Sequence, residues 1–530
     1  MTIKPLFKIP TEIKKNDLEK ALDQAIALEV ATIPTYLNTY YSIKRTWKQE
    51  PAPPTKNNTI DSYQDAVNKD KKIANSKNGD PMQLTTGEGL TYYIKKKGKV
   101  SEKVANHLSI QLQVYANKAA ALIMSVAVEE MLHTSLSSNV KQGLFGPPKL
   151  MKSIPGFPAH LPGHEPYVPI NAAKFSQQQL LTFLRIESPE AFEGKQTNYK
   201  KGGEIENTTI GEFYRMIEIC IKKHYKDKKH YRNDRAQLLP GKGYYGPNSL
   251  NTVYYDEDHN PEFPSDDDSG DLRHVKDWKS AIRALEEVVE QGEGHDGGDK
   301  LSPEGNPVCP NINWDDPTQI NPNDYDNPSL SELSHFDKFL QLYCQGEQFT
   351  NTFEKLGMDF HSFFVYNFPD NPTNYPRKTK TPYINYAQSK MAGVKSSSAS
   401  KSGIEHLINL SDATNAVYTY LFLMIETCYY KKDHTQYEIF MFGVHKGMIW
   451  ALSGLCNAML YQKIEYQGTI YSAAPTWEKY DFSKNSKLTP KQQILEIFDR
   501  MPEGSSGKGI SGWVNDFPDI TLRHKVLSVV

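Results

Sequence analysis

The chain has 530 residues, and its 61 basic and 63 acidic side chains give a formal net charge of −2 at pH 7. This near-balance gives no reason to expect nucleic acid or a membrane surface as a partner. The N-terminal residues lack the apolar stretch and cleavage site of a secretory signal. No apolar run is long enough to cross a bilayer.

The five cysteines are scattered, odd in number, and contain no Cys-x-x-Cys pair. This pattern predicts neither a disulfide framework nor a zinc finger. A reducing, cytoplasmic location is therefore the expectation for this soluble chain. The cysteines are Cys220, Cys309, Cys344, Cys428 and Cys456.

Amphipathic helices are predicted from the start of the chain. Apolar side chains at helical spacing indicate a helix over residues 15–45, with Asp17 as its N-cap, and a second over 102–141. Residues 46–100 between them are rich in Lys, Asn, Pro and Gly, which indicates a long insertion. Prolines then predict an extended loop over 147–170.

Further helices are expected in the rest of the chain. A second polar insertion, residues 226–275, separates two shorter helices from a third and a fourth bundle helix. No alternating pattern predicts a dominant sheet. The expected helices lie at 176–187, 209–224, 275–292, 329–345, 404–431 and 435–464.

Glu29 is the first candidate site residue, because it interrupts the apolar stripe of the first helix. Ala25 lies one turn before it and Ile33 one turn after, so a regular helix points this carboxylate inward. A buried charge requires a cation, a proton or a salt bridge. For a glutamate taken alone, structural pairing is the commoner explanation.

Two Glu-x-x-His pairs favour metal binding over structural pairing as the explanation for Glu29. Glu130 and His133 share one face of the second helix, and Glu332 and His335 share one face of the fourth. A carboxylate and an imidazole three residues apart on a helix can reach one metal ion. One such pair alone is usually a coincidence, but two in this order are far more specific.

The third helix offers two candidates for a second lone glutamate ligand. Glu293 lies nearer the apolar stripe and is the first choice, and Glu290 is the second. Gly292 and Gly294 flank Glu293 and loosen the last turn. These glycines indicate a helix terminus, or room for a substrate or oxidant to approach a metal.

The ligand order is that of di-iron and di-manganese carboxylate bundles: a lone glutamate, a Glu-x-x-His helix, a lone glutamate and a second Glu-x-x-His helix. Carboxylates with imidazole suit iron or manganese, and zinc is a redox-silent competitor. The sequence therefore predicts two metal ions, with iron favoured. The candidate ligands are Glu29, Glu130, His133, Glu293, Glu290, Glu332 and His335.

Other polar residues have simpler explanations. Glu187 and Glu190 could join the site as extra ligands, but an acid at a helix end before proline is more often a capping or loop contact. Glu212 lies in a first helical turn, where the helix dipole stabilises it. His445 is expected to be a core or pocket histidine, and Tyr36 a packing residue close to the site.

Seven segments resemble the ferritin-like domain of the iminophenyl-pyruvate dimer synthase type, which enzymes of the violacein and indolocarbazole pathways contain. The resemblance covers residues 15–345 and, more faintly, the helices and the AAPTW segment beyond. It implies metal-dependent oxidation of small, amino-acid-derived molecules, with the motif acids and histidines falling on the candidate ligands named above. The segments are LEVATIPTYL (28–37), EEMLH (129–133), FPAHLPG (157–163), LRIESPE (184–190), TIGEFY (209–214), VEQGEG (289–294) and ELSHF (332–336).

The predicted fold is mainly α: a ferritin-like four-helix bundle over residues 1–345, with insertions at 46–100 and 226–275, and a C-terminal helical extension over 346–530. The predicted function is a non-haem dimetal oxidase or oxygenase of natural-product biosynthesis, which uses O₂ on a small-molecule substrate held near Tyr36 and the 147–163 loop. A non-catalytic metal-binding scaffold and a metal-assisted hydrolase with zinc or manganese are the alternatives. Homo-oligomer formation is left open.

Overall fold

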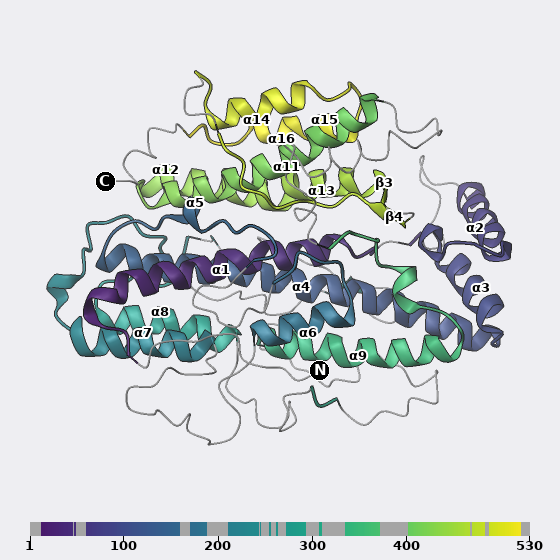
Figure 1. Cartoon of the computed structure of the whole chain (residues 1–530), viewed down its shortest axis with the longest axis horizontal. Coiled ribbons are helices and arrows are strands. Elements are labelled where there is room, and N and C mark those ends of the chain that lie inside the picture. The colour runs from purple at the N-terminus through teal and green to yellow at the C-terminus, as the bar shows by residue number, and fades with distance from the viewer. Residues whose placement is uncertain are drawn as a thin grey trace.

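The computed structural model confirms a mainly helical fold, with helices arranged in layers (Figure 1). Strands among the described residues form only two short antiparallel pairs, β1 (Tyr254–Tyr255) with β2 (Pro261–Glu262) and β3 (Lys463–Tyr466) with β4 (Thr469–Ser472). The described residues are 12–45, 47–48, 60–159, 170–187, 210–242, 244, 254–255, 261–262, 272–292, 307–309, 334–370, 401–466, 469–482 and 487–520.

Two long helices form the middle layer. After the short turn η1 (Lys15–Asp17), α1 spans Leu18–Tyr41 and lies along α4 (Glu102–Leu144). Ser101 starts α4 as its N-cap, since its side chain accepts a hydrogen bond from the Val104 N–H. Both helices confirm the sequence prediction, and almost every residue of α4 beyond Leu108 is buried.

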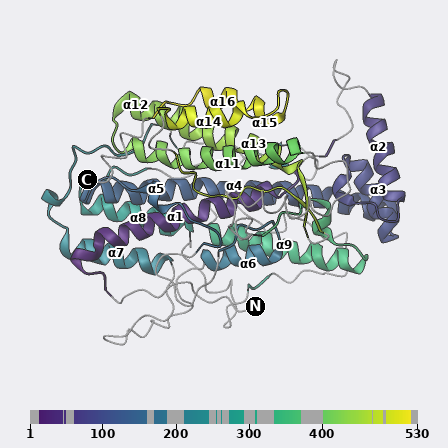
Figure 2. The same cartoon turned by 45° about the horizontal axis from the view of Figure 1, so that its top comes forward.

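Four shorter helices form the layer beneath them: α6 (Gln177–Ile186), α7 (Ile210–His224), α8 (Trp278–Gly292) and α9 (His335–Lys355). α6 packs along α9, and α7 packs along α8 at the other end of the long helices (Figures 1 and 2). α6 and α7 correspond to the helices that the sequence predicts over 176–187 and 209–224, and they pack beside the predicted bundle helices α9 and α8. α6 ends just before Pro189, and α8 ends at Gly292.

The first insertion is more ordered than its polar composition predicted. It contains α2 (Ile60–Asn75), η2 (Pro81–Gln83) and α3 (Gly87–Gly98), and α3 packs against α4. The buried Asp70 carboxylate accepts hydrogen bonds from the Thr85 and Thr86 N–H groups at 2.8–3.0 Å. These contacts hold α2 against the start of α3. The second insertion includes η3 (Lys228–His230) and the β1–β2 pair.

The C-terminal helices cover the other side of α1 and α4, as the layer at the top of Figure 1. Trp477 donates a hydrogen bond to Asn38 Oδ1 on α1 at 3.0 Å, and Tyr429 donates one to the Ser135 carbonyl on α4 at 3.0 Å. The helices are α11 (Lys401–Cys428), α12 (Asp433–Glu438), the π-helix η8 (Ile439–Leu452), α13 (Ser453–Leu460), α14 (Pro490–Asp499), α15 (Ser506–Gly509) and α16 (Ser511–Asn515).

The connections between the layers also contain short helices. α5 (Leu150–Ser153) follows α4 within the proline-rich segment, and η6 (Phe360–Phe363) follows α9. The predicted domain division at residue 345 falls inside α9, which continues to Lys355. That division remains a prediction.

Two stretches are long and apolar enough to span a membrane by length and composition, Glu102–Leu144 and Asp433–Leu460. In the first, 94% of the apolar window is buried within the protein, as in the core helix of a helical bundle; in the second, 56% is buried. Core helices of soluble proteins pass the same test, so these two stretches are weak evidence for a membrane protein.

One disulfide was not predicted. Cys309 is bonded to Cys344 on α9, across 35 residues of sequence, whereas Cys220, Cys428 and Cys456 are free and buried. The spacing of the cysteines in the sequence does not indicate this pairing. The pairing depends on the tertiary structure, which brings Cys309 next to Cys344 on α9. Disulfides are uncommon in reducing compartments, so the pairing weakens the argument for a cytoplasmic location.

Candidate metal centre

Five acidic and histidine side chains meet between the two layers of the bundle. These residues are almost completely buried, with exposed fractions of 0–3%. Donor atoms of Glu130, His133 and His335 all lie within 4.8 Å of one another. The five residues are Glu29 on α1, Glu130 and His133 on α4, Glu187 at the end of α6, and His335 at the start of α9.

Local helix geometry places each of these side chains. Glu130 and His133 are one turn apart on α4, so both face α1 and α9. Ser334 caps α9 by accepting a hydrogen bond from the Asp337 N–H, which fixes His335 as the first residue of the helix. Glu187 is the C-cap of α6, and its backbone N–H donates to the Phe183 carbonyl.

The imidazole Nδ1 atoms face the carboxylates. His335 Nδ1 lies 3.0 Å from Glu130 Oε1 and 3.4 Å from Glu187 Oε2. His133 Nδ1 lies 3.6 Å from Glu29 Oε2 and 3.7 Å from the same Glu130 oxygen. The two rings are stacked, with centroids 5.1 Å apart. Glu130 is thus shared between two histidine–glutamate pairs.

Hydroxyl groups hold the outer oxygen of each carboxylate. Tyr214 on α7 donates a hydrogen bond to Glu29 Oε1, and Tyr36 on α1 donates one to Glu187 Oε1. Thr32 donates to Glu130 Oε2 at 2.6 Å. The carboxylates are therefore fixed from outside, and their other oxygens point toward the histidines.

The Nε2 atoms of the two histidines have different neighbours. His133 Nε2 lies 2.9 Å from the amide oxygen of Gln291 on α8. His335 Nε2 lies 2.9 Å from Glu129 Oε2. Glu129 also accepts two hydrogen bonds from the Lys338 ammonium, at 2.8 and 2.7 Å, and the Lys338 side chain is 1% exposed.

Burial and charge together perturb the acid–base behaviour of the cluster. Burial, reinforced by the charge of Glu130, raises the pKa of Glu29 to about 8. Burial disfavours the charged form of His133, but hydrogen bonds and charges of Glu130 and Glu29 outweigh it and raise its pKa to about 10. The pKa of His335 is also raised, and that of Glu130 is lowered by the two histidines despite burial. Protons on the histidines therefore compensate the buried carboxylates.

The residues fit a metal pair. Neither ring nitrogen of the fully buried His335 has a hydrogen-bond partner of acceptable geometry, which is unusual for a buried polar group. Carboxylate oxygens and imidazole nitrogens converging on a small volume are the donor set that iron and manganese prefer. Cations in this volume would replace the protons on the histidines.

The predicted ligands have three outcomes. The structure brings together Glu29, Glu130, His133 and His335. Glu290 lies on the exposed side of α8 and does not join the described cluster, although it remains a predicted ligand. Glu293 and Glu332 lie outside the described residues, as does Glu190.

Glu187 has a larger part in the cluster than the predicted capping or loop contact. It is the C-cap of α6, and its side chain also reaches His335. The sequence does contain an indication that Glu187 points inward. Glu187 follows Leu180, Phe183 and Leu184 at helical spacing, and all three are buried. His445 behaves as the expected core histidine, with Nε2 2.6 Å from the Tyr244 carbonyl oxygen.

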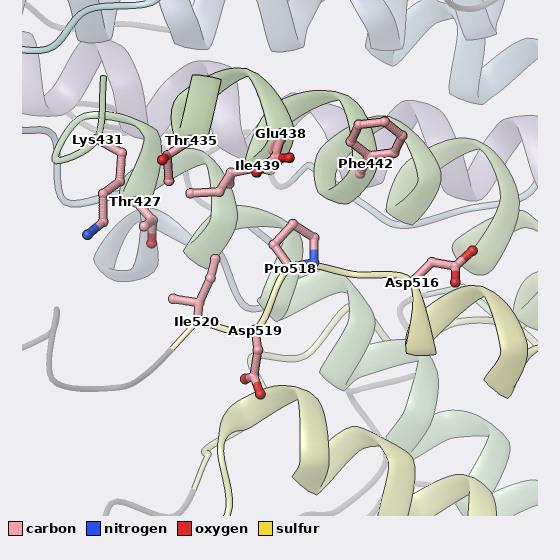
Figure 3. A pocket seen from close by; sticks show the side chains of 10 residues that line it. All are labelled: Thr427, Lys431, Thr435, Glu438, Ile439, Phe442, Asp516, Pro518, Asp519 and Ile520. Carbon is pink, nitrogen blue, oxygen red and sulfur yellow. The ribbon is translucent and has the colours of Figure 1, made fainter. Parts of the chain in front are cut away.

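A separate pocket lies in the C-terminal layer (Figure 3). Its volume is about 550 Å³, and it opens between the end of α11, η8 and residues 516–520. No residue of the carboxylate–histidine cluster lines it. Its walls contain Lys431, Glu438 and Phe442.

The fold and the cluster define a helical-bundle protein with a candidate dimetal site of the carboxylate-bridged kind. Comparison with protein families agrees: residues 22–344 match the ferritin-like family. The chain belongs to the ferritin-like family. The match does not separate the dimer synthase type from other ferritin-like proteins.

No curated protein matches the chain. A crystal structure of a ferritin-like protein from Caulobacter vibrioides is similar, with 14% sequence identity and a TM-score of 0.36, over 84% of this chain and 96% of that one.

Proposed function

We propose that the chain is a non-haem dimetal oxidase or oxygenase of the iminophenyl-pyruvate dimer synthase type, acting on a small, amino-acid-derived substrate. The observation that carries the proposal is the buried cluster in which Glu130 is shared between the Glu29–His133 and Glu187–His335 pairs. Two iron ions held by such donors supply O₂ activation and the removal of electrons or hydrogen from an organic molecule.

The protein side chains would prepare the site for this chemistry. Glu29, His133 and Glu130 would hold one ion, and Glu187, His335 and Glu130 the other. Tyr36 and Tyr214 orient the lone glutamates by hydrogen bonding. The aromatic rings of Phe183 and Phe339 pack against Tyr36 at centroid distances of 4.7 and 5.3 Å, so they exclude water beside Glu187.

The test is elemental analysis followed by an oxygen reaction. Protein purified without added metal should contain iron, and metal-free protein should bind two ferrous ions under anaerobic conditions. Exposure to O₂ should then oxidise the iron and give a transient absorption in stopped-flow measurements. A fully iron-loaded protein that gives no transient and keeps ferrous iron would contradict the oxidase proposal.

The same burial also favours a second candidate, a non-catalytic metal-binding scaffold. All five residues of the cluster are at most 3% exposed, which suits a structural ion as well as a reactive one. The oxygen reaction separates the two functions, because a scaffold retains ferrous iron when O₂ is admitted. A zinc- or manganese-dependent hydrolase would instead be active under strict anaerobiosis.

A further inference from the structure

A stripe of polar side chains runs along α9 inside the protein. After His335, the residues at every third or fourth position are polar, where the buried face of a helix normally carries apolar side chains. All of them are buried, with exposed fractions of 0–4%, and the stripe is about 21 Å long at 1.5 Å per residue. The residues are Lys338, Gln341, Gln345, Gln348 and Thr352.

A matching polar stripe lies on α4. It consists of Gln111, Lys118 and Glu129, which share one face because Gln111 and Glu129 are separated by about five full turns of helix. Their exposed fractions are 3–7%. The two stripes meet where the Lys338 ammonium donates hydrogen bonds to both Glu129 oxygens, at 2.8 and 2.7 Å. We call the two stripes together the polar seam.

α4 and α9 run in opposite directions along the polar seam. Glu129 lies opposite Lys338 near the start of α9, whereas Tyr115, closer to the start of α4, donates a hydrogen bond to the Leu342 carbonyl at 2.8 Å. Gln111 lies one turn further in the same direction, so it is level with a later part of α9. The seam therefore follows both helices toward α3 (Figure 1).

The polar seam joins the metal cluster to the protein surface. At its inner end, Glu129 Oε2 lies 2.9 Å from His335 Nε2. At its outer end, the next turn of α9 brings the stripe to Lys355, which is exposed, and the same face of α4 continues to the half-buried His107. A continuous row of polar side chains thus spans the distance between solvent and the cluster.

Several polar atoms of the seam have no hydrogen-bond partner among the described residues. They are the amide oxygens of Gln111 and Gln341, both amide atoms of Gln348, and the hydroxyl of Thr352. Buried polar groups in native proteins are almost always paired with protein or with ordered water, because an unpaired one is costly. Four such residues along one seam offer buried water molecules the several polar partners that each requires.

Resting on the proposed dimetal function, we propose that the polar seam holds a file of ordered water molecules and is the route by which water passes between solvent and the metal centre. The packing around a metal site controls solvent access to it. Beside Glu187, the rings of Phe183 and Phe339 close the site by packing against Tyr36. The seam approaches the cluster from Glu129 instead, where the lining is polar.

The first test is a crystal structure of the metal-free protein. It should show about three or more ordered water molecules in the seam, each within about 3.2 Å of one of the unpaired atoms. Glutamines that pair directly with one another, with no water between α4 and α9, would overturn the proposal. This readout does not depend on a bound metal.

The second test measures water exchange at the metal. Gln348→Leu places an apolar side chain in the seam, so Mn²⁺-loaded protein should lose most of its enhancement of solvent proton relaxation, while its affinity for Mn²⁺ stays unchanged. Thr352→Val, which replaces only a hydroxyl by a methyl group, should act in the same direction and serves if Gln348→Leu does not fold.

Gln113→Leu is the matched control. Gln113 is a buried glutamine of α4, 2% exposed, but its amide donates to the Ser109 carbonyl of its own helix at 3.1 Å. This variant should keep the wild-type relaxation enhancement per bound ion. An equal loss in Gln113→Leu and Gln348→Leu would mean that general damage to the core, and not the seam, controls water exchange.

These outcomes separate the inference from the proposed function. If folded wild-type protein binds no Mn²⁺, Fe²⁺ or Co²⁺, the dimetal function is wrong, and the route has no metal to serve even where the seam holds water. If Mn²⁺ binds but the seam is dry, or if Gln348→Leu and Thr352→Val leave the relaxation unchanged, the dimetal function stands and the water route is wrong.

Discussion

Tyr214 on α7 donates a hydrogen bond to the Glu29 carboxylate on α1, across 185 residues of sequence. Tyr36 makes the equivalent contact to Glu187 across 151 residues. Each lone glutamate of the cluster is therefore held by one buried phenol. Because burial and the neighbouring carboxylates raise the pKa of both tyrosines, the phenols keep their protons and remain donors.

Tyr214→Phe tests this role. The variant leaves a buried carboxylate oxygen of Glu29 without its phenol donor, so we expect the free energy of unfolding to fall by about 1–3 kcal/mol. Metal affinity should fall by about tenfold, because Glu29 is no longer oriented. Denaturant unfolding and metal titration measure the two effects.

Tyr115→Phe is the matched control. Its hydroxyl donates to the Leu342 carbonyl at 2.8 Å, and the ring is equally buried. This control should lose stability while keeping wild-type metal affinity. A similar loss of affinity in both variants would mean that Tyr214 acts through general stability alone.

Glu187 and Glu290 can be separated by their effect on metal content. Glu187→Gln removes a negative charge from the cluster, so we expect the loaded protein to retain about one ion fewer per chain. Glu290→Gln, on the exposed side of α8, should retain wild-type content. Elemental analysis after removal of free metal measures both.

The same measurement applies to the predicted ligands outside the described residues. Glu293→Gln and Glu332→Gln should each lower metal content if these residues complete the site. If the Glu290→Gln variant loses an ion and the Glu187→Gln variant does not, Glu290 and not Glu187 is the metal ligand.

The disulfide between Cys309 and Cys344 should stabilise the protein. It closes a loop of 35 residues, and the loss of that constraint on the unfolded chain corresponds to about 3–4 kcal/mol. Cys309→Ser should therefore lower the thermal midpoint under non-reducing conditions. With reductant present, wild type and variant should have the same thermal midpoint. If reductant does not change the thermal midpoint of the wild-type protein, that result would argue against the bond.

Asp412 on α11 gives a prediction for pH. Burial raises its pKa from 3.8 to about 6, so the folded protein binds this proton more tightly than the unfolded chain does. The stabilisation of the folded state by this bound proton is fully present below pH ~4 and is lost as the pH rises through about 6. Asp412→Asn should therefore stabilise the protein at pH 7.5 by about 1–3 kcal/mol and have little effect at pH 4.

Unfolding measured at the two pH values checks this expectation. Asp516→Asn, at an exposed position that pairs with Lys446 at 3.1 Å, should change the free energy of unfolding by less than about 0.5 kcal/mol. An Asp412→Asn variant that is destabilised equally at both pH values would indicate that the carboxyl makes a structural hydrogen bond instead.

The sequence by itself determined the helical fold and four members of the cluster. Glu29, Glu130, His133 and His335 could be found because a charged or imidazole side chain on an apolar helical stripe must point inward, whatever lies opposite. The start of α4 is equally local, since Ser101 caps its own helix, whereas α9 begins at His335 and the predicted helix begins at residue 329.

Only the tertiary structure decided what surrounds those side chains. Glu129 meets Lys338 across 209 residues, and Cys309 meets Cys344 where the chain returns to α9. Glu187 reaches the cluster because α6 packs against α9. The local sequence at the end of α6, where a proline follows, does not indicate that packing. Such contacts join segments far apart in sequence, so their partners follow from the packing of the layers and not from the periodicity of any one helix.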